Sequence, residues 1–200
     1  MSFQQFTFPQ VRHDLGLTLH DADLFADTPP AAVREEFAAF LRDDAALAVA
    51  ISTEKAKSEF IIAPILLELR RTSRNQFFLF SGVEWDADAS RGLNGYCDFI
   101  LTRGETQHVL SAPFVAIVEA KNELFRTGFG QCIAAMVGAQ VCNQQAGLTV
   151  PRIYGVVTFG TAWKFLRLDG TTLTIDVPDY YIDNLPKIMG ILKQIVQDHP

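Results

Sequence analysis

Three charged residues lie in or directly after two apolar segments of the chain. Asp98 lies within Tyr96–Thr102, and Glu119 lies near the end of Phe114–Ala120, with Lys121 directly after it. Both segments are rich in β-branched and aromatic residues, which is typical of buried strands. A charge on such a strand is costly unless it is paired or binds a metal ion. We therefore treat these three side chains as candidate site residues.

Strand alternation predicts how these side chains are arranged. Every second side chain of a strand points to the same face, so Asp98 is expected on one face with Tyr96 and Ile100. The same rule places Glu119 and Lys121 together on one face of the next strand. If the two strands are neighbours, two carboxylates and one ammonium group converge at the end of a small sheet.

Two carboxylates beside an ammonium group suit the hydrolysis of phosphodiester bonds. A phosphodiester is unreactive because its negative charge repels nucleophiles and its alkoxide leaving group is poor. A divalent ion neutralises this charge and generates hydroxide near neutral pH. Mg²⁺ prefers oxygen ligands, so Asp98, Glu119 and the backbone carbonyl of Ala120 would hold Mg²⁺ or Mn²⁺. Lys121 would orient the attacking water and stabilise the charge of the transition state.

A purely structural interpretation of the Glu-x-Lys pair also exists. This pattern arises by chance about once in a chain of this length. A salt bridge on a solvated strand end contributes little to stability. Two features favour a site instead: each acid lies in a strongly apolar strand, and Glu119-Ala120-Lys121 ends its strand directly before a helix.

Apolar periodicity and capping residues predict the helices. They are expected at about Ala31–Asp43, from Ser52 or Thr53 to Arg71, at Thr127–Gln145 and at Asn184–Gln197. Pro64 removes a backbone donor from the second helix and should kink it. Asp183 is expected to cap the last helix, and Asp44–Ile51 is ambiguous.

The remaining elements are expected to be strands. Besides the two segments above, they are Phe77–Ser81 with Val83–Asp86, bent at Gly82, and then Arg152–Phe159, Trp163–Leu168 and Leu173–Val177. Residues Phe3–Thr28 contain short alternating pieces that could form edge strands or an extended arm. The order of helices, a strand meander, a helix and further strands indicates an α/β (α+β) fold.

The order Asp98, then Glu119-Ala120-Lys121, on successive strands resembles the PD-(D/E)XK nuclease superfamily, the restriction-endonuclease-like fold. The resemblance implies a core of helix, three-strand meander, helix and strand, and the expected elements from Ser52 to Phe159 follow this order. It also implies that an acid on the first core helix assists the metal, which would be Glu59. A glutamine on the helix after the Glu-x-Lys strand would support the site, and Gln131 matches that place.

The closing segment TFGTAWKFLRL is similar to the strand-turn-strand in the nuclease domains of type I restriction subunits. Two departures are present: Cys97, not proline, precedes Asp98, and Ala135 follows Gln131 where exonuclease-type members have tyrosine. The second departure argues against a helicase-coupled exonuclease. No helicase motif or Walker loop occurs in the chain, so translocation would need a helicase or specificity partner.

The resemblance covers roughly half to two-thirds of the chain. We expect a single domain over 1–200, with an N-terminal extension and helix (1–50), a nuclease-like core (52–168) and a C-terminal helix (183–197). Other residues offer competing roles. Alternative supporting acids are Glu68, Glu84 and Asp86; cations that could contact phosphates are Lys55, Arg70, Arg71, Arg74 and Arg126; Trp85 and Trp163 are expected to pack rather than to stack on bases.

The overall charge counts modestly against tight, non-specific nucleic-acid binding. The formal charge is −6 and the pI about 5.2, whereas such binding depends on lysine and arginine. A catalytically weak or inactive nuclease-fold subunit, acting in binding or assembly, is therefore the alternative function. A small-molecule enzyme on an unrelated α/β fold is disfavoured, because no phosphate-binding glycine loop or nucleophile elbow occurs.

Cysteine usage and hydropathy indicate the compartment. Cys97, Cys132 and Cys142 lie inside expected core elements without a CxxC motif, as expected for reduced thiols in the cytoplasm. The first residues lack the pattern of a signal peptide, and Phe60–Leu67, the longest apolar run, is too short to cross a bilayer. We expect a cytoplasmic protein whose partner is a nucleic acid, with DNA favoured over RNA, and a homodimer if both strands are cut.

Overall fold

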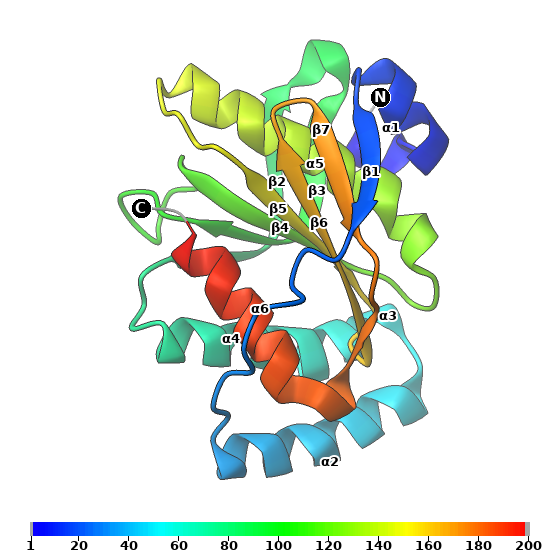
Figure 1. Ribbon diagram of the computed structural model, residues 1–200, viewed down its shortest axis with the longest axis vertical. Helices are drawn as coiled ribbons and strands as arrows, with labels where there is room; N and C mark the ends of the chain where they lie inside the picture. Colours follow the sequence, from blue (N-terminus) through cyan, green and yellow to red (C-terminus); the bar gives the residue numbers. More distant parts are fainter. Residues whose placement is uncertain (1, 199–200) are drawn as a thin grey trace.

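The computed structural model describes residues 2–198 of the chain and has an α/β architecture (Figure 1). Its mixed sheet has the strand order β1-β7-β6-β5-β4-β3-β2, and β8 pairs with β6. The strands are β1 (Thr18–Ala22), β2 (Phe78–Asp88), β3 (Leu93–Thr102), β4 (Phe114–Ala120), β5 (Ile153–Thr158), β6 (Ala162–Asp169), β7 (Thr172–Asp176) and β8 (Tyr180–Tyr181). The helices are α1 (Phe8–Asp14), α2 (Glu35–Ile51), α3 (Glu54–Lys57), α4 (Ala63–Thr72), α5 (Phe125–Gln145) and α6 (Leu185–Gln197), with short helical turns at η1 (Phe3–Gln5), η2 (Ser58–Ile62), η3 (Ala89–Arg91) and η4 (Ile182–Asn184).

The centre of the sheet is a meander followed by a crossover. β2 pairs with β3 and β3 with β4, both antiparallel, whereas β4 and β5 are parallel. Parallel neighbours need a long connection, and α5 supplies it. The order from α3 to β5 is therefore helix, three strands, helix and strand, as expected from the sequence.

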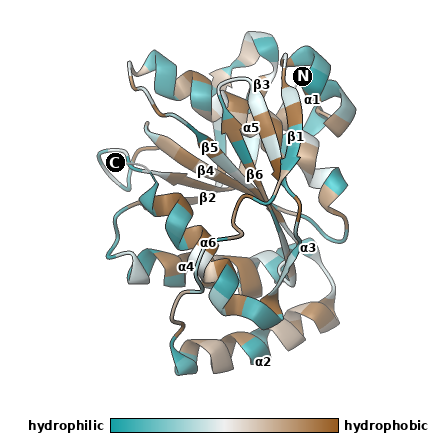
Figure 2. Cartoon of the chain, in the orientation of Figure 1, coloured by the Kyte–Doolittle hydropathy of each residue, from teal (hydrophilic) through white to brown (hydrophobic). Residues whose placement is uncertain are grey.

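Helices cover both faces of this sheet. One apolar cluster joins the sheet to α2, α4 and α6, and a second joins its other face to α1 and α5. β4 is buried along its whole length. Figure 2 shows hydrophobic and hydrophilic residues interspersed along α6, as expected for a helix with one side against a sheet. Within residues 2–198, none of the helices has both the length and the apolar character of a membrane span.

The prediction for the first long helix was wrong at both ends. α2 runs from Glu35 to Ile51, so the ambiguous segment after Asp43 is helical. It starts late because the strap before it, Thr28–Ala31, is extended, and the amide of Ala31 donates to the carbonyl of Pro186. Of the two cap candidates, Thr53 caps α3 and accepts from the Ala56 amide, whereas Ser52 ends α2 with a left-handed conformation.

The kink expected at Pro64 takes the form of a π-helical turn. The turn spans Ser58–Ile62 and separates α3 from α4, and Pro64 lies in the first turn of α4. Proline cannot donate a backbone hydrogen bond, and a wider turn accommodates this. The cap expected at Asp183 is wrong, since Asn184 occupies the N-cap and no side chain caps α6.

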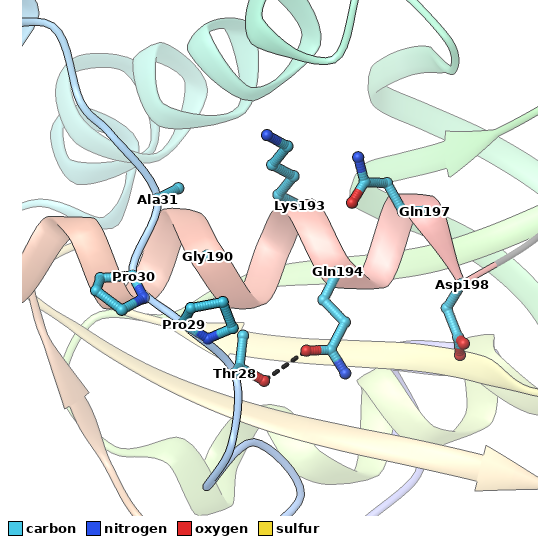
Figure 3. A pocket seen from close by; sticks show the side chains of 9 residues that line it. All are labelled: Thr28, Pro29, Pro30, Ala31, Gly190, Lys193, Gln194, Gln197 and Asp198. Atoms are coloured by element: carbon cyan, nitrogen blue, oxygen red, sulfur yellow. Dashed lines mark hydrogen bonds between the residues drawn. The ribbon is translucent and has the colours of Figure 1, made fainter.

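The first thirty residues hold structure that the sequence only partly indicated. β1 is an edge strand parallel to β7, which agrees with the edge-strand expectation. The helix α1 was not expected, although Thr7 and Gln10 form a capping box at its start. After β1, the strap Thr28–Ala31 crosses α6 at Gly190, as Figure 3 shows.

We predict that Gly190→Ala destabilises the protein. A Cβ at this position would lie 2.2 Å from the carbonyl oxygen of Pro29, which is backbone and cannot rotate away. Moving the strap off α6 should cost about 1–3 kcal/mol in thermal or denaturant unfolding. Gly138→Ala is the control, because its Cβ would meet side-chain atoms no nearer than 3.2 Å and should cost less. Equal stability of the two variants would contradict the prediction.

Candidate active site

Asp98 is fixed against the end of β4 by its own carboxylate. The β3–β4 ladder starts at the pair Phe99 and Val118, so the backbone of Asp98 lies just beyond it. Its Oδ2 accepts a hydrogen bond of 2.8 Å from the amide of Ala120. The side chain thus replaces a missing ladder bond and brings the carboxylate to the tip of the neighbouring strand.

The expected alternation along β3 is wrong at this point. Cys97 and Ile100 both join the apolar cluster on the α5 side, although they are three residues apart, while Phe99 joins the opposite cluster. Asp98 therefore does not simply share a face with Tyr96 and Ile100. The physical reason lies on β2, where Gly82 is opposite Asp98 and has a φ of +63°. This conformation is easy only for glycine and breaks the regular pleat.

Glu119 is a fully buried carboxylate in an unfavourable environment. It has no exposed surface, and within residues 2–198 neither of its oxygens has a hydrogen-bond partner. Burial raises its pKa well above the usual value, and the neighbouring Asp98 raises the pKa further. Lys121 opposes this shift, and Glu54 adds to it. A carboxylate left in this state normally has a functional reason.

Lys121 and Gln131 meet beside this carboxylate. The Nζ of Lys121 lies 3.7 Å from Glu119 Oε2 and donates to Gln131 Oε1 at 3.1 Å. Gln131 in turn donates through Nε2 to the carbonyl of Tyr96 at 3.3 Å. The stem of Lys121 lies against Gly128, where a Cβ would come within 2.9 Å of its Cγ. The ammonium group is thus held from two sides.

Glu59 lies elsewhere, and Glu54 lies near the site. The carboxylate of Glu59 is about half exposed and pairs with Lys55 at 2.9 Å. Glu54, at the start of α3, lines the same surface pocket as Lys121 and raises the pKa of Glu119. Its place in the first turn after Thr53 was visible in the sequence. Only the fold shows that this turn reaches the end of β4.

Lys57 is a second residue that the sequence did not indicate. It is almost fully buried, and its Nζ donates to the backbone oxygen of Asn122 at 2.7 Å and to its Oδ1 at 3.0 Å. This contact ties α3 to the residue that follows Lys121. The helix α3 and the segment that follows β4 are therefore linked directly at the site.

The competing acids and aromatic residues have structural positions. Glu68 is buried and forms a two-pronged ion pair with Arg34 at 2.7 and 2.8 Å, which lowers the pKa of Glu68. Glu84 and Asp86 are exposed on β2. Trp163 is fully buried, and Trp85 stacks on Phe114, so the expectation that both tryptophans pack is confirmed.

The candidate phosphate-contacting cations are spread over the surface. Lys55 pairs with Glu59, and Arg71 lies 3.8 Å from Glu68. Arg70 lies in the last turn of α4, and Arg74 follows the end of this helix. Arg126 lies in the first turn of α5 and lines a surface pocket with Phe129 and Lys164, which is a different pocket from that of Lys121.

The oxygen atoms at this point fit a hard divalent ion. They belong to Asp98, to Glu119 and to the carbonyl of Ala120. The amide of Ala120 points toward Asp98 on β3, and in a strand the carbonyl of a residue points to the same side as its amide. Among residues 2–198, no three histidine, cysteine, aspartate or glutamate side chains come together as a metal-binding group. Magnesium tolerates such a sparse set, since it keeps several waters. Glu59 makes no contact that would add it to the set.

Two of the three cysteines, Cys97 and Cys132, lie in the buried region beside Glu119. Cys97 and Cys132 are buried, Cys142 is half-buried, and all three are free thiols, as expected. Burial raises the pKa of Cys132, and the charge of Glu119 raises it further. Burial likewise raises the pKa of Cys142 to about 11. The thiols next to the acids are therefore neutral and add no charge to the site.

The site thus combines the carboxylate of Asp98, from the middle of β3, with a carboxylate, a carbonyl and a lysine at the end of β4, and α5 supplies a glutamine. Comparisons of the chain with protein-family models, with curated proteins and with solved structures found no match.

Proposed function

We propose that this protein is a metal-dependent nuclease that hydrolyses DNA phosphodiester bonds with Mg²⁺ or Mn²⁺, on a restriction-endonuclease-like core. The observation that carries the proposal is the buried Glu119 carboxylate, whose oxygens have no hydrogen-bond partner among residues 2–198, while Asp98 lies beside it and Lys121 lies 3.7 Å away. The cost of this arrangement is explained if the oxygens bind a cation. A cytoplasmic setting is part of the proposal and agrees with the free thiols.

Each residue of the site has one role in this proposal. Asp98, Glu119 and the carbonyl of Ala120 would hold the ion, which when bound supplies charge neutralisation and an activated water. Lys121 donates toward the phosphate oxygens and the attacking water, stabilising negative charge as it develops. Gln131 keeps the Lys121 ammonium group in place through its 3.1 Å hydrogen bond. The buried region beside Glu119 excludes bulk water, which strengthens these interactions.

The proposal is tested with purified protein, plasmid and linear DNA, and Mg²⁺, Mn²⁺ or EDTA. We expect cleavage with either ion and none with EDTA. Calorimetry with Mn²⁺ should show binding that Asp98→Asn weakens at least about tenfold. Absence of cleavage by the wild-type chain under all these conditions would contradict the proposed activity. Linear and circular substrates together separate endonuclease from exonuclease action.

A nuclease-fold subunit without strong catalysis is the second candidate function. The formal charge of −6 favours it, as does the lack, within the described residues, of a group of three or more histidine, cysteine, aspartate or glutamate side chains that could hold a metal ion. It predicts no Mn²⁺ binding at millimolar concentration, even with DNA present. Size-exclusion chromatography with a helicase or specificity partner, or of the chain alone for a homodimer, would then identify its assembly role.

We predict that Glu54 supports the site and that Glu59 does not. Glu54→Ala removes a negative charge that acts on Glu119, so it should lower the cleavage rate about tenfold and weaken Mn²⁺ binding. Glu59→Ala is the matched control on the same helical segment, and its rate should stay within about twofold of the wild type, because its carboxylate pairs with exposed Lys55. A larger loss in Glu59→Ala than in Glu54→Ala would reverse this assignment.

A further inference from the structure

The N-terminal segment is packed against the elements that carry the candidate site. We name residues Phe3–Asp14, which contain η1 and α1, the N-terminal arm. Phe3, Phe6 and Val11 are buried in the cluster formed with α5. Figure 1 shows α1 beside α5. The arm is therefore part of the layer that covers the sheet on the α5 side.

The arm comes closest to α5 and β3 next to the site residues. A Cβ on Gly130 would lie 2.0 Å from the carbonyl oxygen of Phe6, so the arm backbone touches α5 one residue before Gln131. A Cβ on Gly95 would lie 2.6 Å from Gln4 Oε1, and Gly95 has a φ of +129° that favours glycine. Both close approaches thus occur where only glycine fits.

Gln4 and Gln131 bind the same backbone oxygen. Tyr96 precedes Asp98 by two residues and lies beyond the start of the β3–β4 ladder, so its carbonyl has no strand partner there. Gln4 Nε2 donates to this oxygen at 2.9 Å and Gln131 Nε2 donates to it at 3.3 Å. A carbonyl oxygen has two lone pairs and can accept both bonds. The other end of Gln131 accepts from Lys121.

We propose that Gln4 is a positioning residue of the active site: together with Gln131 it fixes the Tyr96 carbonyl, and through Gln131 it fixes the Lys121 ammonium group. This inference rests on the proposed nuclease function. It gives the N-terminal arm a role in catalysis without contact to substrate. Loss of the Gln4 bond lets Tyr96 and Gln131 shift, and a small displacement of Lys121 lowers the rate of the chemical step.

The test compares Gln4→Ala with Gln5→Ala. Gln5 is adjacent, and its side chain accepts only from the Ser2 amide at 2.8 Å, so it controls for damage to the arm. Gln4→Ala should lower kcat about threefold to tenfold with KM and the melting temperature nearly unchanged, whereas Gln5→Ala should match the wild type. The double variant Gln4→Ala with Gln131→Ala should lose less than the product of the two single losses.

A measurement independent of activity separates this inference from the proposed function. In NMR spectra, the side-chain amide signals of Gln131 should move in Gln4→Ala and stay in place in Gln5→Ala. Unchanged Gln131 signals, or equal kcat in both variants of an active enzyme, would overturn the inference alone. Moved signals in a chain that cleaves no DNA would contradict the proposed function while leaving the contact in place.

Discussion

Replacing Lys121 by methionine is expected to lower the rate of DNA cleavage about a hundredfold to a thousandfold. Methionine retains the apolar stem that packs against Gly128 and removes the ammonium group that lies 3.7 Å from Glu119. The transition state then loses the ammonium group that lies beside Glu119. Single-turnover cleavage of a labelled duplex, with Mn²⁺ in excess, measures this effect on the chemical step.

Mn²⁺ binding should change much less than the rate in Lys121→Met. Without the Lys121 ammonium group, the metal ion is repelled less, which favours binding. The pKa of Glu119 also rises, which disfavours binding, so the two effects oppose each other. Lys55→Met is the control, because Lys55 is highly exposed and pairs only with Glu59. Undiminished cleavage by Lys121→Met would remove this lysine from the mechanism.

Glu119→Gln is expected to abolish Mn²⁺ binding and to stabilise the metal-free protein. The wild-type carboxylate is buried without hydrogen-bond partners. A neutral amide of the same shape can donate to the adjacent carboxylate of Asp98, so the buried negative charge, which Lys121 only partly offsets, disappears. The gain should be about 1–3 kcal/mol at pH 8, or roughly 2–10 °C in melting temperature. Many sites show this exchange of stability for function.

The pH dependence of this gain has a definite sign. The pKa of Glu119 is raised in the folded state, so the folded protein binds more protons than the unfolded chain above the ordinary pKa of a glutamate, about 4.5. Its favourable contribution is present below that pH and is lost as the pH rises toward the folded pKa. Glu119→Gln has no titrating group at this position and does not lose this stability. The difference in melting temperature between the variant and the wild type should therefore grow from pH 4.5 upward.

A control variant and a melting experiment with Mn²⁺ test the prediction for Glu119→Gln. Glu59→Gln is the control, because its carboxylate is half exposed and its removal should leave the melting temperature within about 1 °C at every pH. Millimolar Mn²⁺ should raise the melting temperature of the wild type and not that of Glu119→Gln. A Glu119→Gln protein that is less stable than the wild type at pH 8 would show that the carboxylate is satisfied.

The sequence determined the order of the central elements and several of their bounds, although β3 starts at Leu93, three residues before the predicted strand. Phe114–Ala120 is a strand over its full predicted length, and α5 starts only two residues before the predicted helix. Long apolar runs and turn residues carry this information locally, so one sequence is enough. The nearness of Glu119 to Lys121 followed in the same way, since strand alternation is a local property.

Errors arose where a contact distant in the chain decides the local structure. The sequence predicts the start of a helix at Ala31, but its amide donates to the carbonyl of Pro186 and the strap stays extended. Asp98 departs from alternation because Gly82, on another strand, distorts the pleat opposite to it. The sequence indicated Glu59 as the acid of this helical segment, whereas the fold places Glu54 in the same surface pocket as Lys121.

The chain by itself therefore fixed which residue types could perform the chemistry and in which elements they stand. Tertiary structure alone decided that the Asp98 carboxylate bonds to Ala120, that Glu119 has no hydrogen-bond partner within residues 2–198, and that Gln4 reaches the Tyr96 carbonyl. The physical reason is that secondary structure follows from neighbours along the chain. Burial and hydrogen bonding of a polar group depend on residues far away along the chain, such as Gln4 and Tyr96 with a separation of 92.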